Sequence, residues 1–163
     1  MIDYNKKWTT DLRQGEAGEM VIARLMLQKG YDIVEMNKTM DYDIKITDGF
    51  FEKTLEVKTD RYEYFTGRIT DNMFIEVSCN GKLSGVRGSK ADYFVYYYPD
   101  WEVAYFITRE KLLSLIHFGR RASQSGDKGK VVGYLLNRHE FSGEFKIVKI
   151  KKDKFWDNLE RED

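Results

Sequence analysis

The sequence contains almost no cysteine, proline or histidine, and these shortages exclude several classes of protein. Cys79 is the only cysteine, so neither an intrachain disulfide nor a zinc cluster of thiolates can form. The two histidines, His117 and His139, stand apart in the sequence and make no zinc or histidine-based nuclease motif. We expect Cys79 to be a half-buried thiol in a strand, because free cysteine usually behaves as a small apolar residue.

Long apolar runs and a net charge are also absent. No apolar run approaches the roughly 20 residues that span a bilayer, and the first residues lack the apolar stretch of a secretory signal. We therefore expect a soluble, cytoplasmic protein with no membrane partner. Basic and acidic residues both total 27, so the overall charge does not by itself indicate nucleic-acid binding. Local patches can still create the field that a DNA partner needs.

The composition is typical of one folded domain. The chain has 163 residues, of which 42% are hydrophobic and 15% aromatic, enough to bury a core. We find no repeat, linker or second domain, and place the core at about residues 10–152, with a charged tail in which Phe155 and Trp156 can dock. The fold class expected is α/β, a single domain with a mixed central β-sheet flanked by helices. The first helix should cover one face and a later helix the other.

Hydrophobic periodicity and turn residues predict the individual elements. Helices are expected at residues 10–29 and 109–118, and loops at 62–72, 80–90 and 119–133. A loop that contains a short helix is the alternative for residues 80–90. Strands are expected at residues 31–35, 41–47, 50–58, 73–79, 93–98, 103–108, 134–136 and 145–150. Thr9 or Thr10 should cap the first helix and Thr108 the second. Asp48-Gly49 should form a turn, and the aromatic strand 93–98 should fill the core on both sides.

The most informative stretch places Asp43 on one expected strand and Glu56 and Lys58 on the next. Side chains alternate along a strand, so Glu56 and Lys58 share one face while Leu55 and Val57 point to the other. Two neighbouring strands would then bring two carboxylates and an ammonium to one face. Mg²⁺ takes oxygen ligands, usually one or two carboxylates plus water and substrate phosphate. The pattern therefore predicts a site that hydrolyses phosphodiesters.

The first expected helix adds Gly15 and Glu19, four residues apart. A helix with this spacing, then Asp43 in a strand, then Leu-Glu-Val-Lys at residues 55–58, resembles the PD-(D/E)xK nuclease superfamily. The opening is most similar to the archaeal Holliday-junction resolvases. The sequence departs from the family pattern at Tyr42, where proline would precede the aspartate. The resemblance implies a restriction-endonuclease-like core.

The resemblance also implies the cofactor and the roles of the site residues. Mg²⁺ is the implied metal, and Mn²⁺ can substitute for it. The implied metal ligands are Asp43, Glu56, the backbone carbonyl of Val57, and Glu19. Lys58 would orient or activate the attacking water. Glu16, one turn before Glu19, is the alternative for the acidic residue that the helix contributes.

Two basic segments are candidate contacts to DNA. Residues 80–90 combine cations, serines and glycines that suit a phosphate backbone, although an ordinary surface loop is the alternative. The candidate residues there are Lys82, Ser84, Arg87, Ser89 and Lys90. Arg120 and Arg121, in the later basic segment, are expected to hold a second stretch of DNA. Glu76 interrupts an apolar strand, and either faces solvent or lies beside the acidic cluster.

We therefore expect a Mg²⁺-dependent DNA endonuclease that hydrolyses phosphodiester bonds. It could be structure-specific like the junction resolvases, of the restriction type, or a nuclease of a phage or mobile element. A homodimer is expected where both strands of a duplex are cut. The alternatives are a non-catalytic DNA-binding or assembly module that retains the nuclease fold, and a nuclease directed at RNA. The intact set of Asp43, Glu56 and Lys58 speaks against the non-catalytic module.

Overall fold

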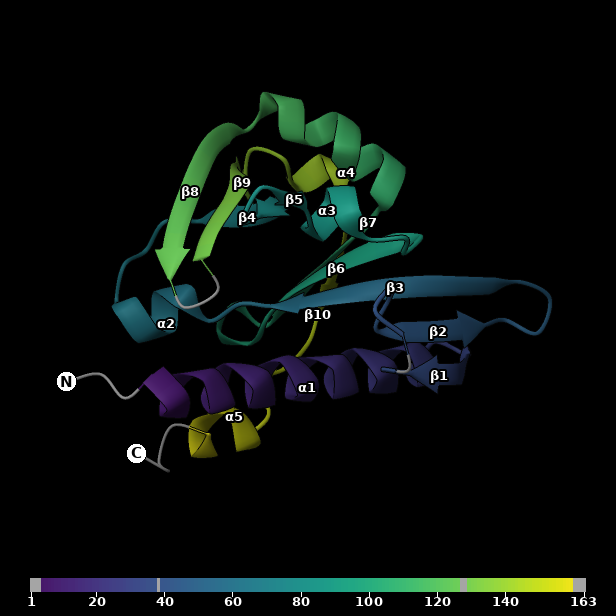
Figure 1. Cartoon of the computed structure of the whole chain (residues 1–163). Coiled ribbons are helices and arrows are strands. Elements are labelled where there is room, and N and C mark those ends of the chain that lie inside the picture. Colours follow the sequence, from purple (N-terminus) through teal and green to yellow (C-terminus); the bar gives the residue numbers. More distant parts are fainter. Residues whose placement is uncertain (1–3, 38, 127–128, 160–163) are drawn as a thin grey trace.

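The computed structural model describes residues 4–37, 39–126 and 129–159, which form two β-sheets and the helices around them (Figure 1). The α-helices are α1 (Tyr4–Gln28), α2 (Tyr62–Thr66), α3 (Gly85–Gly88), α4 (Arg109–Leu115) and α5 (Phe155–Asn158). The strands are β1 (Asp32–Met36), β2 (Ile44–Thr47), β3 (Glu52–Thr59), β4 (Asn72–Cys79), β5 (Lys82–Leu83), β6 (Tyr93–Tyr98), β7 (Val103–Thr108), β8 (Arg120–Gly126), β9 (Gly129–Asn137) and β10 (Lys146–Lys149). None of the described helices is both long and apolar enough to cross a membrane.

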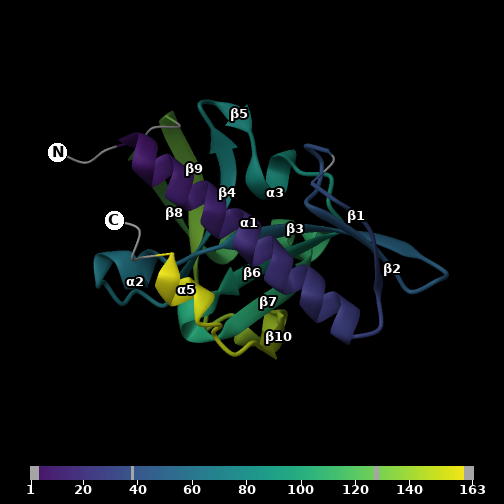
Figure 2. The ribbon, with the colours of Figure 1, turned by 90° about the horizontal axis from the view of Figure 1, so that it is seen from below.

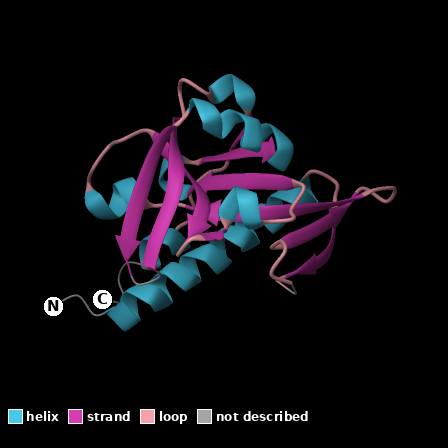
Figure 3. Ribbon diagram, turned by 45° about the horizontal axis from the view of Figure 1, so that its top comes forward, coloured by secondary structure: helices cyan, strands magenta, loops and turns pink. Residues whose placement is uncertain are grey.

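The larger sheet has six strands in the order β1-β2-β3-β6-β7-β10. Its strands pair antiparallel except β3 and β6, which run parallel, so the sheet is mixed. A second sheet has four antiparallel strands in the order β5-β4-β9-β8 (Figure 3). The predicted fold class, an α/β domain with a mixed central sheet flanked by helices, is confirmed.

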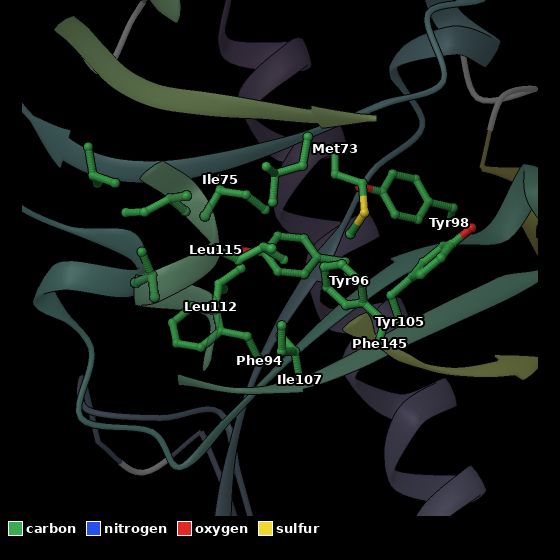
Figure 4. Close-up of a cluster of buried hydrophobic side chains, with 14 of the residues drawn as sticks. Met73, Ile75, Phe94, Tyr96, Tyr98, Tyr105, Ile107, Leu112, Leu115 and Phe145 are labelled. Atoms are coloured by element: carbon green, nitrogen blue, oxygen red, sulfur yellow. The ribbon is translucent and has the colours of Figure 1, made fainter. Parts of the chain in front are cut away.

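The two faces of the larger sheet are covered by different elements. On one face, Ile22 and Met26 of α1 pack with Leu55, Val57 and other buried residues of β2, β3 and β6. Figure 2 shows α1 crossing this face diagonally. On the opposite face, α4 and the second sheet cover β6 and β7. The residues packed there include Met73, Ile75, Phe94, Tyr96, Ile107, Leu112 and Leu115 (Figure 4).

Strand β6 is the centre of the domain. Five of its six residues are buried, and they alternate between the two clusters: Phe94, Tyr96 and Tyr98 face α4, whereas Val95 and Tyr97 face α1. The prediction that this aromatic run fills the core on both sides is confirmed. The short helix α5 extends the core beyond residue 152, because the Trp156 ring is fully buried against Tyr97.

Helix α1 comes unusually close to β3 at Gly18. A Cβ atom at this position would lie 1.7 Å from the Thr59 hydroxyl oxygen, whereas one at Gly15 would meet no atom within 4 Å. Gly18 is therefore the glycine that the packing requires, although the sequence pattern pointed to Gly15. The close approach sets the position of Glu19, the next residue of the helix.

Two local predictions are confirmed. The Thr108 side chain caps α4 by accepting a hydrogen bond from the Lys111 amide at 3.2 Å. Asp48 and Gly49 form the turn between β2 and β3, where Gly49 has a φ of 95° and the Asp48 carboxylate accepts hydrogen bonds from the amides of Phe50 and Phe51. Gly49 suits this backbone conformation because it has no Cβ atom.

Several element boundaries were wrong. Helix α1 begins at Tyr4, so Thr9 and Thr10 lie inside it and not at its N-cap position. Strand β2 begins at Ile44, which leaves Asp43 just before the strand. The expected loop 62–72 contains α2. Residues 80–90 contain the short helix α3, which was the alternative considered for this segment, and also the strand β5, which was not expected.

The largest error concerns residues 119–133, which were expected to form a loop. They contribute the whole of β8 and the start of β9, paired from Arg120↔Leu135 to Gly126↔Gly129. The β8 sequence, Arg-Arg-Ala-Ser-Gln-Ser-Gly, has no apolar alternation that would mark a strand. Pairing with β9, which is itself paired with the distant strand β4, stabilises this strand.

Candidate active site

Asp43 is held against β3 by two hydrogen bonds. Its amide donates to the Leu55 carbonyl at 2.9 Å, and its carboxylate oxygen Oδ2 accepts from the Val57 amide at 2.7 Å. The first bond continues the β2–β3 ladder by one residue, and the second fixes the carboxylate. Since the N–H and C=O of one strand residue point to the same edge, the Val57 carbonyl faces the side on which Asp43 lies.

Glu56 and Lys58 share a face of β3, as the alternation predicted. The Lys58 ammonium lies 2.8 Å from a Glu56 carboxylate oxygen, and 15% of the Glu56 side chain and 41% of the Lys58 side chain are exposed. In the parallel pairing, Glu56 lies beside Phe94 and Lys58 beside Tyr96. The two charged residues therefore face the second sheet, on the side of the larger sheet opposite α1.

Glu19 reaches the same region from α1. Its carboxylate accepts a hydrogen bond from the Asn37 side-chain amide at 2.6 Å. Asn37 follows β1 with a φ of 53°, and its backbone amide donates to the Asp43 carbonyl at 2.8 Å. Asparagine tolerates this left-handed backbone better than most residues. Asn37 thus connects Glu19 to Asp43, and it is a site residue that the sequence reasoning missed.

The acidic residues experience one another's charge. Burial raises the pKa of Glu19 from 4.5 to about 7; the Asn37 bond opposes this, and the nearby charges of Asp43, Glu16 and Glu56 add to it. Burial and then the Glu56 charge raise the pKa of Asp43 from 3.8 to about 6, against the Val57 amide and Lys58. Raised pKa values from clustered carboxylates are characteristic of functional sites.

Lys58 responds in the opposite sense. Burial lowers the pKa of its ammonium, but Glu56, Asp43 and Glu76 together outweigh burial, so the pKa is raised above the ordinary value of 10.5. Lys58 therefore stays protonated at neutral pH. It is a fixed positive charge beside two carboxylates, and this limits the roles that it can play.

The oxygen donors suit a hard divalent cation. Within the part of the chain that the structure describes, no three His, Cys, Asp or Glu side chains form a ready metal cage. Glu56 is instead bonded to Lys58, and Glu19 to Asn37. Mg²⁺ needs only one or two carboxylates, the rest of its shell being water and phosphate oxygens. Asp43 and Glu56, whose repulsion a cation would relieve, meet that need.

Of the two glutamates of α1, Glu19 is the one in position. The Glu16 side chain is exposed and makes no hydrogen bond or ion pair with the described residues. Glu19 is half-buried and shares the field of Asp43 and Glu56. The geometry therefore favours Glu19 over Glu16 as the acidic residue contributed by the helix.

The segment with the first basic candidates lies partly beside the site. Ser89 donates a hydrogen bond to the Asp41 carbonyl at 3.2 Å, and the Lys90 ammonium lies 3.8 Å from the Asp41 carboxylate. These two residues thus support the chain just before Asp43. Arg87 instead lies over the Tyr134 ring, with its guanidinium 5.9 Å from the ring centroid.

The remaining candidates of this segment are spread around α3. Lys82 is exposed on β5, and Ser84 precedes the first turn of α3. The Ser84 hydroxyl is buried without a hydrogen-bond partner among the described residues. The five candidates therefore do not form one continuous surface.

The two arginines of the later segment point to opposite faces of β8, because neighbouring strand residues alternate. Arg120 lines a cavity of about 640 Å³ that Lys58 and Glu76 also line. Arg121 does not line this cavity. The structure thus separates two residues that the sequence treated as one patch, and it places Glu76 on the side of Lys58.

Comparisons with known proteins give little further guidance. No protein-family model matches the chain, and no curated protein matches it. Among solved structures, a bacterial homing endonuclease, I-Ssp6803I, is similar to 62% of this chain over 70% of its own length, with 18% sequence identity and a TM-score of 0.48. At that TM-score the likeness carries no argument about function.

Proposed function

We propose that this protein is a Mg²⁺-dependent DNA endonuclease that hydrolyses phosphodiester bonds. The observation that carries the proposal is the convergence of Asp43, Glu56 and Lys58 at one edge of β3. Asp43 is bonded to the Val57 amide at 2.7 Å, and Glu56 to Lys58 at 2.8 Å. The preference for DNA is an expectation from the family resemblance of residues 15–58.

Asp43 and Glu56 would hold the metal, together with the Val57 carbonyl, and Glu19 would complete the acidic group. A bound Mg²⁺ supplies a Lewis acid that polarises the phosphate and lowers the pKa of water. The Val57 amide keeps the Asp43 carboxylate in one orientation, so this side chain loses little conformational entropy when the metal and substrate bind.

Lys58 would act by charge and not as a general base. Its raised pKa keeps the ammonium protonated at neutral pH. A protonated lysine stabilises the negative charge that grows on the phosphate during hydrolysis, which is usually the largest single contribution to such catalysis. Glu56 orients this ammonium in the absence of substrate.

The direct test is cleavage of supercoiled plasmid, linear duplex and four-way-junction DNA in Mg²⁺, Mn²⁺ or EDTA. Lys58→Ala should lose at least about 100-fold in rate if Lys58 provides transition-state stabilisation. Lys53→Ala is the matched control, because Lys53 lies on the same strand but lines a pocket beside Leu55 on the α1 face. Comparing the four-way junction with linear duplex tests whether cleavage is structure-specific. A matched RNA substrate tests whether the protein prefers DNA or RNA.

Equal cleavage by wild type and Lys58→Ala would refute the assignment, as would cleavage that persists in EDTA. Cleavage lost equally in Lys53→Ala and Lys58→Ala would point to general damage of β3. Homodimer formation stays a prediction, which sedimentation of the protein on cleavable duplex would check.

One observation favours the second candidate, a non-catalytic DNA-binding module. Glu19 accepts a hydrogen bond from Asn37 at 2.6 Å and Glu56 from Lys58 at 2.8 Å, so both carboxylates already have partners within the protein and need no metal ion. Titration calorimetry with Mg²⁺ or Mn²⁺ separates the candidates. Heat of binding that disappears in Asp43→Asn supports the nuclease, whereas no metal binding in the presence of DNA supports the module.

A further inference from the structure

The cavity beside Lys58 lies against the open face of the second sheet. One face of that sheet packs on the core through Met73, Ile75 and Leu136. The other face carries Phe74, Leu135 and Arg120, which the strand pairings align in one row across β4, β9 and β8. All three of these residues line the cavity of about 640 Å³. We call this space the β-sheet cleft.

The Phe74 ring reaches over Gly133 on this open face. A Cβ atom at Gly133 would lie 2.6 Å from the tip of the Phe74 ring, so the absence of a side chain at Gly133 leaves the space that the ring occupies. Phe74 remains partly exposed toward the cleft. Such a ring is a platform on which a nucleic-acid base can stack, a contact worth about 1–3 kcal/mol per base.

Most charged groups of the cleft are already paired, and Arg120 is not. Arg61 is bonded to Asp100 through two nitrogens, both at 2.9 Å. The Glu63 carboxylate accepts two backbone amides and the Trp101 indole. The exposed Arg120 side chain makes no hydrogen bond or ion pair with the described residues. Its guanidinium is therefore available to a phosphate.

The cleft and the acidic cluster meet at one residue. Lys58 lines the cleft and is bonded to Glu56 at 2.8 Å, whereas Asp43 and Glu56 lie outside the lining. A strand that follows the cleft from Arg120 would thus bring a phosphate to Lys58, beside the carboxylates. The cleft volume of about 640 Å³ falls within the range of about 300–1,000 Å³ of small-molecule pockets, which suits an unpaired strand better than a duplex.

We propose that the β-sheet cleft binds a single DNA strand, with Arg120 holding a phosphate, Phe74 stacking on a base and Lys58 receiving the next phosphate. This inference rests on the proposed function for its substrate class. It adds that the DNA enters the site as an unpaired strand, and that β8 and β9 form one wall of the path.

The neighbouring arginines of β8 provide a matched pair of variants. Binding of a fluorescein-labelled single-stranded DNA oligonucleotide is measured by anisotropy in EDTA, over a series of salt concentrations. Arg120→Gln should weaken binding about five-fold at 0.1 M salt and reduce the salt slope by about 0.7, the value for one phosphate contact of a single strand. Arg121→Gln removes the same charge from the opposite face and should change affinity by less than about two-fold.

A second variant, Phe74→Leu, keeps an apolar side chain on the sheet and should weaken single-strand binding without changing the salt slope, because it removes stacking and no charge. Circular dichroism and the unfolding midpoint confirm that each variant is folded. Duplex DNA and single-stranded RNA of the same sequence are the comparison probes. The duplex should bind with no difference between Arg120→Gln and Arg121→Gln.

Equal losses in the two arginine variants, no single-strand binding by wild type, or a larger Arg120 effect on duplex than on single strand would each overturn the inference. Since the assay contains EDTA, it is independent of cleavage. If the protein cuts DNA but Arg120→Gln does not change single-strand binding, the proposed nuclease function stands and the proposed role of the β-sheet cleft is wrong. If the protein cuts no DNA but Arg120→Gln weakens single-strand binding as expected, the proposed role of the β-sheet cleft stands and the nuclease assignment is wrong.

Discussion

Replacing Asp43 with asparagine should stabilise the protein in the absence of metal. The carboxylate accepts the Val57 amide at 2.7 Å, and an asparagine side-chain oxygen can accept the same bond. Burial and the Glu56 charge make ionised Asp43 unfavourable in the folded state. Asparagine has the same shape and no charge, so the substitution removes the repulsion and keeps the hydrogen bond.

The size of the gain follows from the pKa of Asp43. Folding raises this pKa from 3.8 to about 6. At 1.36 kcal/mol per pKa unit, the difference is about 3 kcal/mol when Asp43 is fully ionised. Asp43 is only partly buried, and solvent screening reduces this figure, so we expect Asp43→Asn to gain about 1–3 kcal/mol at pH 8.

The pH dependence has a defined sign. Between the ordinary pKa and the raised one, the folded state binds more protons than the unfolded state, so stability falls as pH rises. For Asp43 this loss runs from about pH 4 to above pH 6. Glu19, whose pKa is raised to about 7, contributes a loss of the same sign. Asp71 and Asp100 have lowered pKa values and act in the opposite direction.

The assay is urea unfolding of wild type and Asp43→Asn between pH 4 and pH 8, in EDTA. The difference between the two profiles reports Asp43 and its interaction with Glu19 and Glu56, because the remaining acids are common to both proteins. Asp41→Asn, two residues earlier and half exposed, is the control and should change stability by less than about 0.5 kcal/mol. Wild type in Mg²⁺ at 100 times its dissociation constant should gain about 2.7 kcal/mol that the Asp43 variant lacks.

A difference profile that is flat with pH, or an asparagine variant less stable than wild type at pH 8, would refute this reasoning. Either result would mean that burial and the Glu56 charge do not raise the pKa of Asp43 in the folded protein. A Mg²⁺ gain of equal size in Asp43→Asn would separately remove Asp43 from the metal site.

Further predictions concern the packing and the charges around the site. Gly18→Ala should lower the free energy of unfolding by about 1–3 kcal/mol, because the added Cβ atom overpacks against Thr59. Gly15→Ala in the same helix should raise it by about 0.5–1 kcal/mol. Urea unfolding distinguishes the two variants, and equal effects would contradict the close approach of α1 to β3 at Gly18. Trp156→Ala should cost about 3–5 kcal/mol if α5 belongs to the core, and an unchanged midpoint would show that it does not. Glu76→Gln should lower the pKa of the Lys58 ammonium, measurable by NMR titration, and an unchanged value would mean that Glu76 does not reach Lys58.

Local sequence was sufficient for much of the site. Asp43, Glu56 and Lys58 are separated by few residues, so a turn at Asp48-Gly49 and side-chain alternation bring them together without help from the rest of the chain. The same holds for the Thr108 cap and for β6, in which aromatic residues and Val95 leave no charged residue on either face. Their catalytic roles stay a prediction.

Other features depend on contacts between distant segments, and no local pattern marks them. In the sequence, Asn37 looks like any polar residue that follows a strand. Only the packing of α1 places Glu19 beside it. Gly15 and Gly18 look alike in the sequence, and only the approach of Thr59 distinguishes them.

The sequence by itself determined the six strands of the larger sheet and the spacing of Asp43, Glu56 and Lys58, because periodicity, turn residues and short spacings act over a few residues. The tertiary structure alone decided that β8 exists, that Arg120 and Arg121 face opposite sides, and that a cleft opens beside Lys58. The physical reason is that β8 has too little apolar surface to form by local preference. It exists through hydrogen bonds to β9, and that pairing creates both the wall of the cleft and the position of Arg120.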